Sequence, residues 1–78
     1  MSYQALLHKL APDLNPAGIE ASMRLHYGTL DHLPRETFVA EVQLAADLED
    51  QSPGILRKIA DSMGMAVDFA KWEASHAA

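Results

Sequence analysis

The sequence contains no cysteine, and this absence removes several kinds of structure and chemistry. No disulfide can stabilise the fold, and no thiolate can hold a metal ion or act as a nucleophile. The chain also lacks the roughly 18–20 consecutive apolar residues of a transmembrane helix, so we expect no membrane partner. A cysteine-free chain fits a reducing compartment, and residues 1–10 lack the features of a secretory signal. We therefore expect a cytoplasmic protein.

Basic residues are also few, and this limits the partners that the protein can bind. Six Lys and Arg stand against eleven Asp and Glu, which gives a formal net charge of −5. Binding to nucleic acid requires cations that neutralise phosphates, so the charge disfavours it. An acidic surface keeps a protein soluble, and it also suits a basic partner. Asp47, Glu49 and Asp50 form a candidate acidic patch near the end of a predicted helix, where the helix dipole disfavours negative charge.

Proline and glycine occur only four times each, at positions where helices would begin and end. Asn15-Pro16 and Ser52-Pro53 are typical N-cap and first-position pairs, and Gly28 and Gly64 are typical of helix ends. Ser2 is a further candidate N-cap. The segment from Gly28 to Leu33 is either a loop or a short turn capped by Thr29. No stretch alternates as a half-buried strand does.

The spacing of apolar residues then predicts helices over residues 3–10, 16–27, 34–50, 53–63 and 66–75. We predict one all-α domain over residues 1–78, a compact bundle of four to five short helices. The third helix has a wide apolar arc and is expected to be central, and the last two form a C-terminal helical hairpin around Gly64. The predicted core consists of Leu6, Leu10, Ile19, Met23, Phe38, Val42, Ala45, Ile55, Ile59, Met63 and Val67.

Motifs for catalysis or metal binding are missing. His26 and His32 stand six residues apart, whereas two ligands on one helix face need a spacing of three or four. The serines lie in no Gly-x-Ser-x-Gly context, and the glycines are scattered rather than gathered in a phosphate-binding loop. We expect no enzyme, no cofactor and no metal site.

Residues 56–65, LRKIADSMGM, resemble the first helix and turn of a helix-turn-helix DNA-binding motif. Ala60 and Gly64 match its small residue and its turn glycine, and Ile59, Met63 and Met65 match its apolar positions. The resemblance implies a small DNA-binding regulator that uses residues 55–76. The following helix offers Asp68 and Glu73 but only Lys71 as a base, which suits phosphates poorly. A helical hairpin closed by a glycine gives the same pattern without DNA.

The last predicted helix is apolar on two sides. Val67, Ala70 and Ala74 share one face, and Phe69, Trp72 and His76 share nearly the opposite face. If the first face packs on the core, the second is a candidate interaction patch, because tryptophan is enriched at interface hot spots. The alternative is that the first or the third helix covers these aromatic residues within the monomer.

The leading hypothesis is therefore a non-catalytic protein–protein interaction module, accessory or inhibitor-like, that binds a protein partner or forms a homo-oligomer. Short chains of this kind are common among accessory proteins of bacteria and phages. The alternative is the helix-turn-helix-like regulator.

Overall fold

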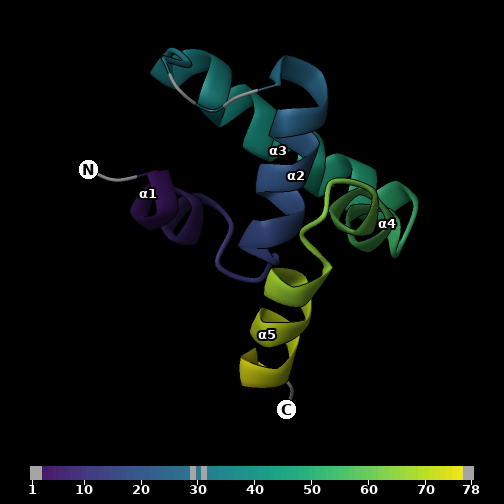
Figure 1. The fold of residues 1–78 in the computed structure, drawn as a ribbon. Coiled ribbons are helices and arrows are strands. Elements are labelled where there is room, and N and C mark those ends of the chain that lie inside the picture. The colour runs from purple at the N-terminus through teal and green to yellow at the C-terminus, as the bar shows by residue number, and fades with distance from the viewer. Residues whose placement is uncertain (1–2, 29, 31, 77–78) are drawn as a thin grey trace.

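Five helices make up the protein in the computed structural model, which describes residues 3–28, 30 and 32–76, without the side chains of Tyr3 and Gln4. Their bounds are α1 Tyr3–Leu10, α2 Pro16–Tyr27, α3 Arg35–Gln51, α4 Ile55–Ser62 and α5 Ala66–His76. No strand occurs among the residues that the structure describes, and the helices pack into one bundle (Figure 1). The predicted all-α fold is therefore confirmed. No helix among the described residues is both long and apolar enough to cross a membrane.

Helix α2 begins and ends as the sequence predicts. The Asn15 side chain accepts a hydrogen bond from the Ala17 N–H at 3.0 Å, and Pro16 follows it at the first helical position. Gly28 ends the helix with φ 78°, a left-handed conformation that glycine adopts without steric cost. Its N–H donates to the Arg24 carbonyl oxygen, which would otherwise lack a partner at the helix end. The other two predicted caps, Ser2 and Thr29, lie outside the described residues.

The start of α4 differs from the prediction. Ser52 and Pro53 belong to a turn that the Ile55 N–H closes on the Ser52 carbonyl oxygen at 3.0 Å, with Gly54 left-handed at φ 92°. Proline followed by a left-handed glycine is typical of a type II turn. Glu49 caps the helix instead, because its carboxylate accepts from the N–H groups of Gly54 at 2.7 Å and Leu56 at 3.2 Å. The prediction that Ser52 caps this helix is therefore wrong.

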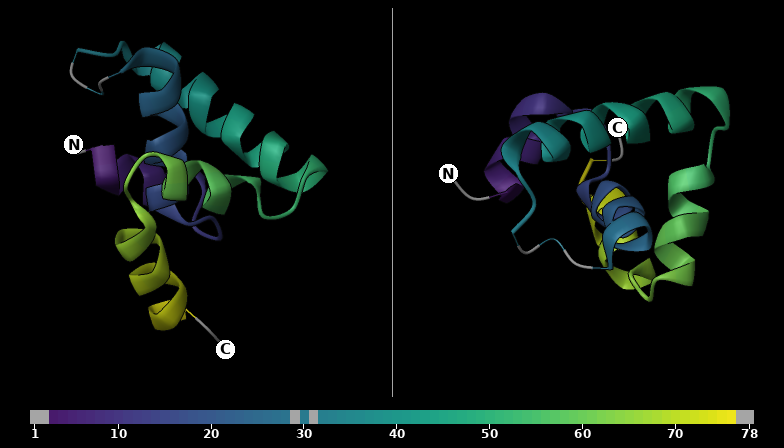
Figure 2. Two further views of the ribbon diagram at one scale, coloured as in Figure 1. Left: turned by 45° about the vertical axis from the view of Figure 1, so that its right-hand side comes forward. Right: turned by 90° about the horizontal axis from the view of Figure 1, so that it is seen from above.

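The sequence suggested that the third helix is central, and this prediction is wrong. The central helix is α2. Helix α2 contacts each of the other four helices and runs through the middle of the bundle (Figures 1 and 2). Its small residues allow close packing: a Cβ built on Gly18 would lie only 2.8 Å from the Leu56 Cβ and 3.0 Å from the Phe69 Cε2. The wide apolar arc of α3 is only partly used, since Val39 and Leu44 stay exposed.

The core draws residues from all five helices. Of the predicted members, Ile19, Met23, Phe38, Val42 and Ala45 are buried, and Leu6, Ile55, Ile59 and Met63 are partly buried against them. Two predictions are wrong: Leu10 is 41% exposed and Val67 is 68% exposed. In α1, Leu7 is buried in place of Leu10. Leu56 of α4 and Phe69 of α5 are also buried, and the prediction missed them.

The last two helices are joined around Gly64, which has φ 74°. The Met65 N–H donates to the Ala60 carbonyl oxygen at 2.8 Å and so closes the end of α4. Beyond this turn α5 points away from α4, so the two helices form a corner (Figure 2, left). This corner brings α5 beside the N-terminal half of α2.

Candidate functional site

The candidate patch required that the face of α5 with Val67 be buried and the face with Phe69 be exposed. The structure shows the reverse for these two residues. Phe69 is buried with 8% of its surface exposed, whereas Val67, Ala70 and Ala74 are exposed. The reason is Gly18 in α2, whose missing side chain leaves the space that the Phe69 ring enters. Phe69 is therefore a core residue, and its prediction as part of an exposed patch is wrong. Helix α2, rather than the first or the third helix, covers it.

Trp72 and His76 remain at the surface. The Trp72 side chain is partly buried, and the exposed His76 ring stacks on it with a centroid distance of 4.0 Å and an interplanar angle of 9°. The His76 Nδ1 also lies 2.9 Å from the Trp72 carbonyl oxygen, where its N–H can donate. These two contacts place the His76 ring against the single tryptophan of the chain near the end of α5.

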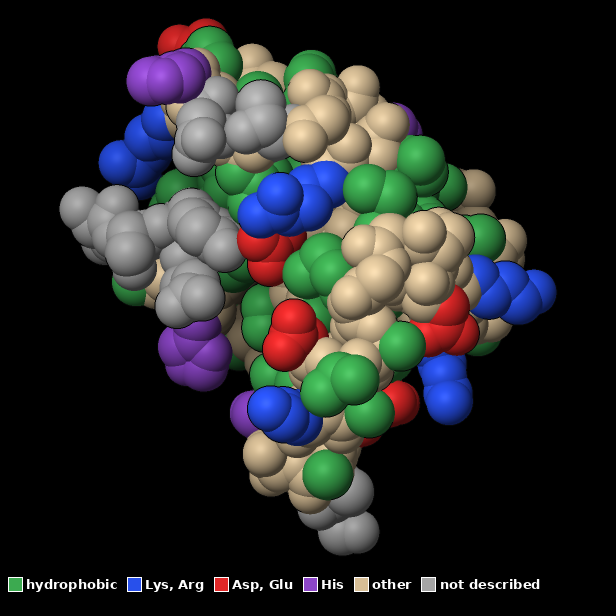
Figure 3. All heavy atoms as spheres, in the orientation of Figure 1, with side chains coloured by type: hydrophobic (Ala, Val, Ile, Leu, Met, Phe, Trp, Pro, Cys, Tyr) green, Lys and Arg blue, Asp and Glu red, His purple; other side chains and the backbone are tan. Residues whose placement is uncertain are grey.

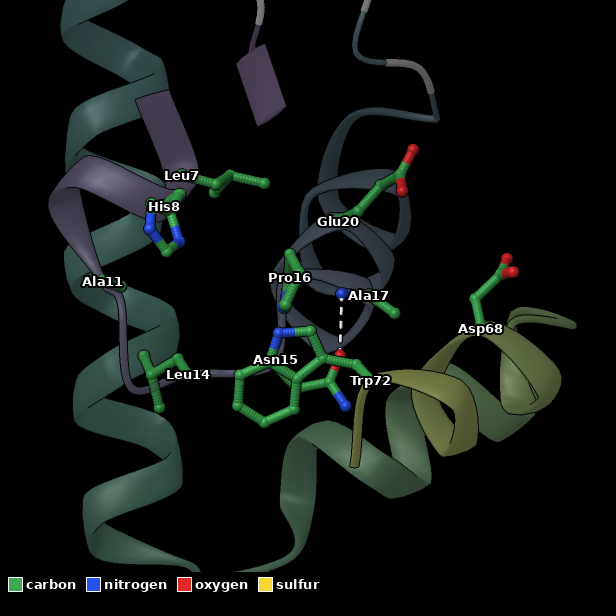
Figure 4. Close-up of a pocket in the computed structure, with 10 residues that line it drawn as sticks. All are labelled: Leu7, His8, Ala11, Leu14, Asn15, Pro16, Ala17, Glu20, Asp68 and Trp72. Atoms are coloured by element: carbon green, nitrogen blue, oxygen red, sulfur yellow. Dashed lines mark hydrogen bonds between the residues drawn. The ribbon is translucent and has the colours of Figure 1, made fainter. Parts of the chain in front are cut away.

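A groove of about 430 Å³, here called the Trp72 groove, lies between α1 and α5. Helices α1 and α5 do not contact each other within the described ranges, and the start of α2 forms the floor between them (Figure 4). The groove is lined by Leu7, His8, Ala11, Leu14, Asn15, Pro16, Ala17, Glu20, Asp68 and Trp72.

One buried side chain organises this groove. Asn15 is 6% exposed, and besides capping α2 it donates from Nδ2 to the Phe69 carbonyl oxygen at 2.9 Å. The first bond fixes the start of α2, and the second ties α5 to it. Asn15 and Trp72 both line the groove (Figure 4), so the residue that ties α5 to α2 belongs to the same hollow as the tryptophan.

The two sides of the groove differ in character. Leu7, Leu14 and Trp72 give it apolar surface, whereas Glu20 and Asp68 form an acidic side (Figure 4). Glu20 forms an ion pair with Arg24 at 3.0 Å, and its side chain is only 16% exposed. Acidic side chains also lie in the middle of the face drawn in Figure 3, over α2 and the start of α5 and among hydrophobic side chains.

A second hollow of about 370 Å³, here called the Arg57 hollow, lies on the other side of Trp72. It shares Leu14, Asn15 and Trp72 with the Trp72 groove, so the two adjoin at these residues. Its charged lining consists of Asp13, Glu49, Arg57 and Glu73. A partner segment that passes over Trp72 would therefore meet acidic side chains on both sides.

The candidate acidic patch is only partly a free surface. Glu49 is turned towards the N-terminus of α4, where it accepts the two hydrogen bonds described above. Asp47 and Asp50 are exposed, and Asp47 accepts a hydrogen bond from Gln43 at 3.2 Å. The carboxylate of Glu49 thus has a structural role that its position in a charged run did not reveal. A binding role for Asp47 and Asp50 stays a prediction.

A cluster that sequence reasoning missed joins α2 to α3. The carboxylate of Glu41 is mostly buried and accepts from the Tyr27 hydroxyl at 2.9 Å, while the His26 Nδ1 lies 3.1 Å from it. The hydrogen bond to Glu41, then burial, then the charge of Glu41 raise the pKa of Tyr27 above its usual value. The available signal was the position of Glu41 between Phe38 and Val42 on the apolar stripe of α3, where a charge needs a partner.

Ser22 is buried in the core, and the hydroxyls of Ser62 and Ser75 donate to carbonyl oxygens of their own helices. His8 lies on the α1 side of the Trp72 groove, opposite the carboxylates of Glu20 and Asp68 (Figure 4). Within residues 3–28, 30 and 32–76 no three His, Asp or Glu side chains are placed to bind one metal ion.

The corner formed by α4 and α5 is similar in shape to the first helix and turn of a helix-turn-helix motif, followed by a second helix. Ala60 is fully buried and Gly64 is left-handed, as that motif requires of these two positions. The exposed surface of α5, however, carries Asp68 and Glu73 with Lys71 as its basic residue. This charge opposes the approach of α5 to phosphates.

No family model matches the chain, and no curated protein or solved structure is significantly similar to it.

Proposed function

We propose that the protein is a small, non-catalytic protein–protein interaction module whose partner occupies the Trp72 groove. The observation that carries this proposal is the placement of the partly buried Trp72 between two adjoining hollows. A tryptophan at the wall of a desolvated pocket is typical of residues that dominate binding energy. The groove volume of about 430 Å³ lies within the range of roughly 300–1,000 Å³ of small-molecule pockets, so the groove has room for a side chain of a partner.

The contacts that hold the groove together support the same function. Asn15 fixes the end of α2 against α5, and the stacked His76 orients the indole. A pre-formed site binds without a large entropic cost of ordering its own side chains. An accessory or inhibitor-like protein that docks on a larger protein would need such a surface.

Site-specific photo-crosslinking tests this function. A photoreactive phenylalanine derivative replaces His8, an exposed residue at the edge of the groove, in cells that naturally make the protein. The control carries the same derivative at Gln43, which is exposed on α3 and lines neither hollow. We expect a discrete crosslinked protein from position 8 and none from position 43. The same pattern at both positions, or no crosslink at either, would refute binding in the groove.

The crosslinked protein is then identified by mass spectrometry, purified and titrated against the wild type and Trp72→Ala. We expect Trp72→Ala to weaken binding by about 30-fold, which corresponds to the ~2 kcal/mol of a hot-spot residue. Circular dichroism of the variant checks that its helices remain. Light scattering over a range of concentrations shows whether the partner is a second copy, because a homo-oligomer would then form without any other protein.

The helix-turn-helix resemblance provides the alternative, in which residues 55–76 bind duplex DNA. The shape of the α4–α5 corner favours this alternative, and the charge of α5 opposes it. Fluorescence anisotropy with labelled duplexes of random and defined sequence tests it at low and at physiological salt. Sequence-dependent binding that Lys71→Ala weakens would support the DNA-binding function and contradict the interaction module. We expect no such binding.

A further inference from the structure

The Trp72 groove combines two features that one kind of side chain can satisfy together. Leu14 and Trp72 supply apolar surface, and Glu20 and Asp68 supply carboxylates, with Asp68 on the same helix as Trp72. A purely apolar side chain would gain nothing from the carboxylates, and a small cation would leave the apolar surface uncovered. A long aliphatic stem with a cationic head fits both sides.

Asp68 and Trp72 are related by one helical turn on α5. Residues four apart share a helix face, so the carboxylate and the indole both border the groove. Within the described part of the chain the Asp68 side chain forms no hydrogen bond or ion pair, whereas that of Glu20 is paired with Arg24. Asp68 is thus the carboxylate at this site whose charge is not neutralised by a neighbour.

The charges around Trp72 are complementary to a basic partner. The two adjoining hollows are lined by Asp13, Glu20, Glu49, Asp68 and Glu73, and by Arg57 as the one arginine or lysine. Like the chain as a whole, which has a net charge of −5, this region is acidic. Such a surface attracts a basic segment and repels an acidic one before any contact is made.

We propose that the Trp72 groove binds an arginine side chain presented by a basic segment of a partner protein. The planar guanidinium stacks on the indole of Trp72 and donates hydrogen bonds to Asp68, while the stem packs on Leu14. Arginine fits better than lysine, because lysine carries a compact, strongly hydrated charge that neither stacks nor forms paired hydrogen bonds. This inference rests on the proposed function and names the chemistry of the partner.

Trp72 is the only tryptophan in the chain, so its fluorescence reports on the groove directly. The probe is the capped peptide Gly-Gly-Arg-Arg-Gly-Gly, titrated into the whole protein at low salt. Matched peptides carry lysine or the neutral isostere citrulline in place of arginine. We expect a saturable change with arginine, a severalfold weaker one with lysine, and none with citrulline.

Two variants that carry the same net charge test whether the arginine binds at Asp68. Asp68→Asn removes the proposed partner of the guanidinium, and Asp47→Asn removes an exposed carboxylate that lines neither hollow. Asp68→Asn should weaken arginine binding about fivefold, the upper range for an exposed ion pair, and Asp47→Asn should leave it unchanged. Asp68 is exposed, so thermal melts of both variants should resemble that of the wild type.

Equal weakening by both variants would mean general attraction to an acidic protein and would overturn the proposal. Equal binding of lysine or citrulline, or no saturation with arginine, would also overturn it. If the peptide fails while the crosslink at position 8 and the weaker partner binding of Trp72→Ala are observed, the groove binds a partner of other chemistry. In that case the interaction module stands and only the arginine assignment falls.

Discussion

Replacing Asn15 should show how much one side chain contributes to the Trp72 groove, because two substitutions separate its two hydrogen bonds. Its Oδ1 accepts from the Ala17 N–H at 3.0 Å, and its Nδ2 donates to the Phe69 carbonyl oxygen at 2.9 Å. Asn15→Ser keeps a hydroxyl that can cap α2 but does not reach α5. Asn15→Ala removes both bonds.

The expected magnitudes follow from the two bonds. A neutral intramolecular hydrogen bond contributes about 0.5–1.5 kcal/mol, so Asn15→Ser should lower the free energy of unfolding by about 1 kcal/mol. Loss of a helix N-cap costs about 1 kcal/mol more, so Asn15→Ala should lower it by about 2 kcal/mol. For a domain of this size, 1 kcal/mol corresponds to a change in Tm of about 4–8 °C.

Urea denaturation followed by circular dichroism measures both values, and an unchanged m-value shows that the compactness of the unfolded state is unaffected. Ser52→Ala is the control, because the sequence suggests an N-cap at Ser52 and the structure places it in a turn without one. It should change stability by less than about 0.5 kcal/mol. If Asn15→Ser were as stable as the wild type, the bond to α5 would contribute nothing, and our account of how the groove is held would be refuted.

Three further substitutions or titrations test other parts of the structure. Glu49→Ala should lower the free energy of unfolding by about 1 kcal/mol in urea, because Glu49 caps α4, whereas Asp50→Ala should be nearly neutral; equal effects would contradict the cap. Gly18→Ala gains about 1 kcal/mol of helix propensity, but it places a Cβ 2.8 Å from the Leu56 Cβ of α4, where overpacking costs about 1–3 kcal/mol. Thermal melts should therefore show that the free energy of unfolding falls by up to about 2 kcal/mol. A rise in Tm would show that there is room for a methyl group between α2 and α4. Tyr27 has a folded-state pKa above its unfolded value because it donates to Glu41, so its contribution to stability is present below pH 10 and is lost as pH rises through the folded pKa. Ultraviolet titration of the tyrosines should show this raised pKa in the wild type and a lower one in Glu41→Gln, and identical curves would rule out the contact.

The sequence alone determined the helices and most of their ends. Asn15-Pro16, Gly28 and Gly64 are local signals: an N-cap oxygen, a proline that lacks an N–H, and glycines that accept a positive φ. These effects depend on a few neighbouring residues, so they can be read before the fold is known. The absence of cysteine and the excess of acid are likewise properties of composition.

Where a local sequence signal fits two conformations, contacts with the rest of the fold select one of them. Ser52-Pro53 is compatible with a helix start or with a turn, and the turn forms because Glu49, from the preceding helix, reaches the free N–H groups of α4. The sequence places Glu49 in a charged run and gives no sign of this contact. A prediction from spacing therefore assigned the cap to the wrong residue.

The orientation of α5, and with it the candidate site, was also decided by the tertiary structure. This helix has apolar residues on two sides, so its own pattern does not say whether Val67 or Phe69 is buried. The choice depends on the shape of the surface that it meets, and Gly18 leaves space there for the ring of Phe69. Burying Phe69 places Trp72 against the start of α2 and opens the groove beside it. Periodicity identifies the faces of a helix, whereas the fit of side chains across a contact selects the face that is buried.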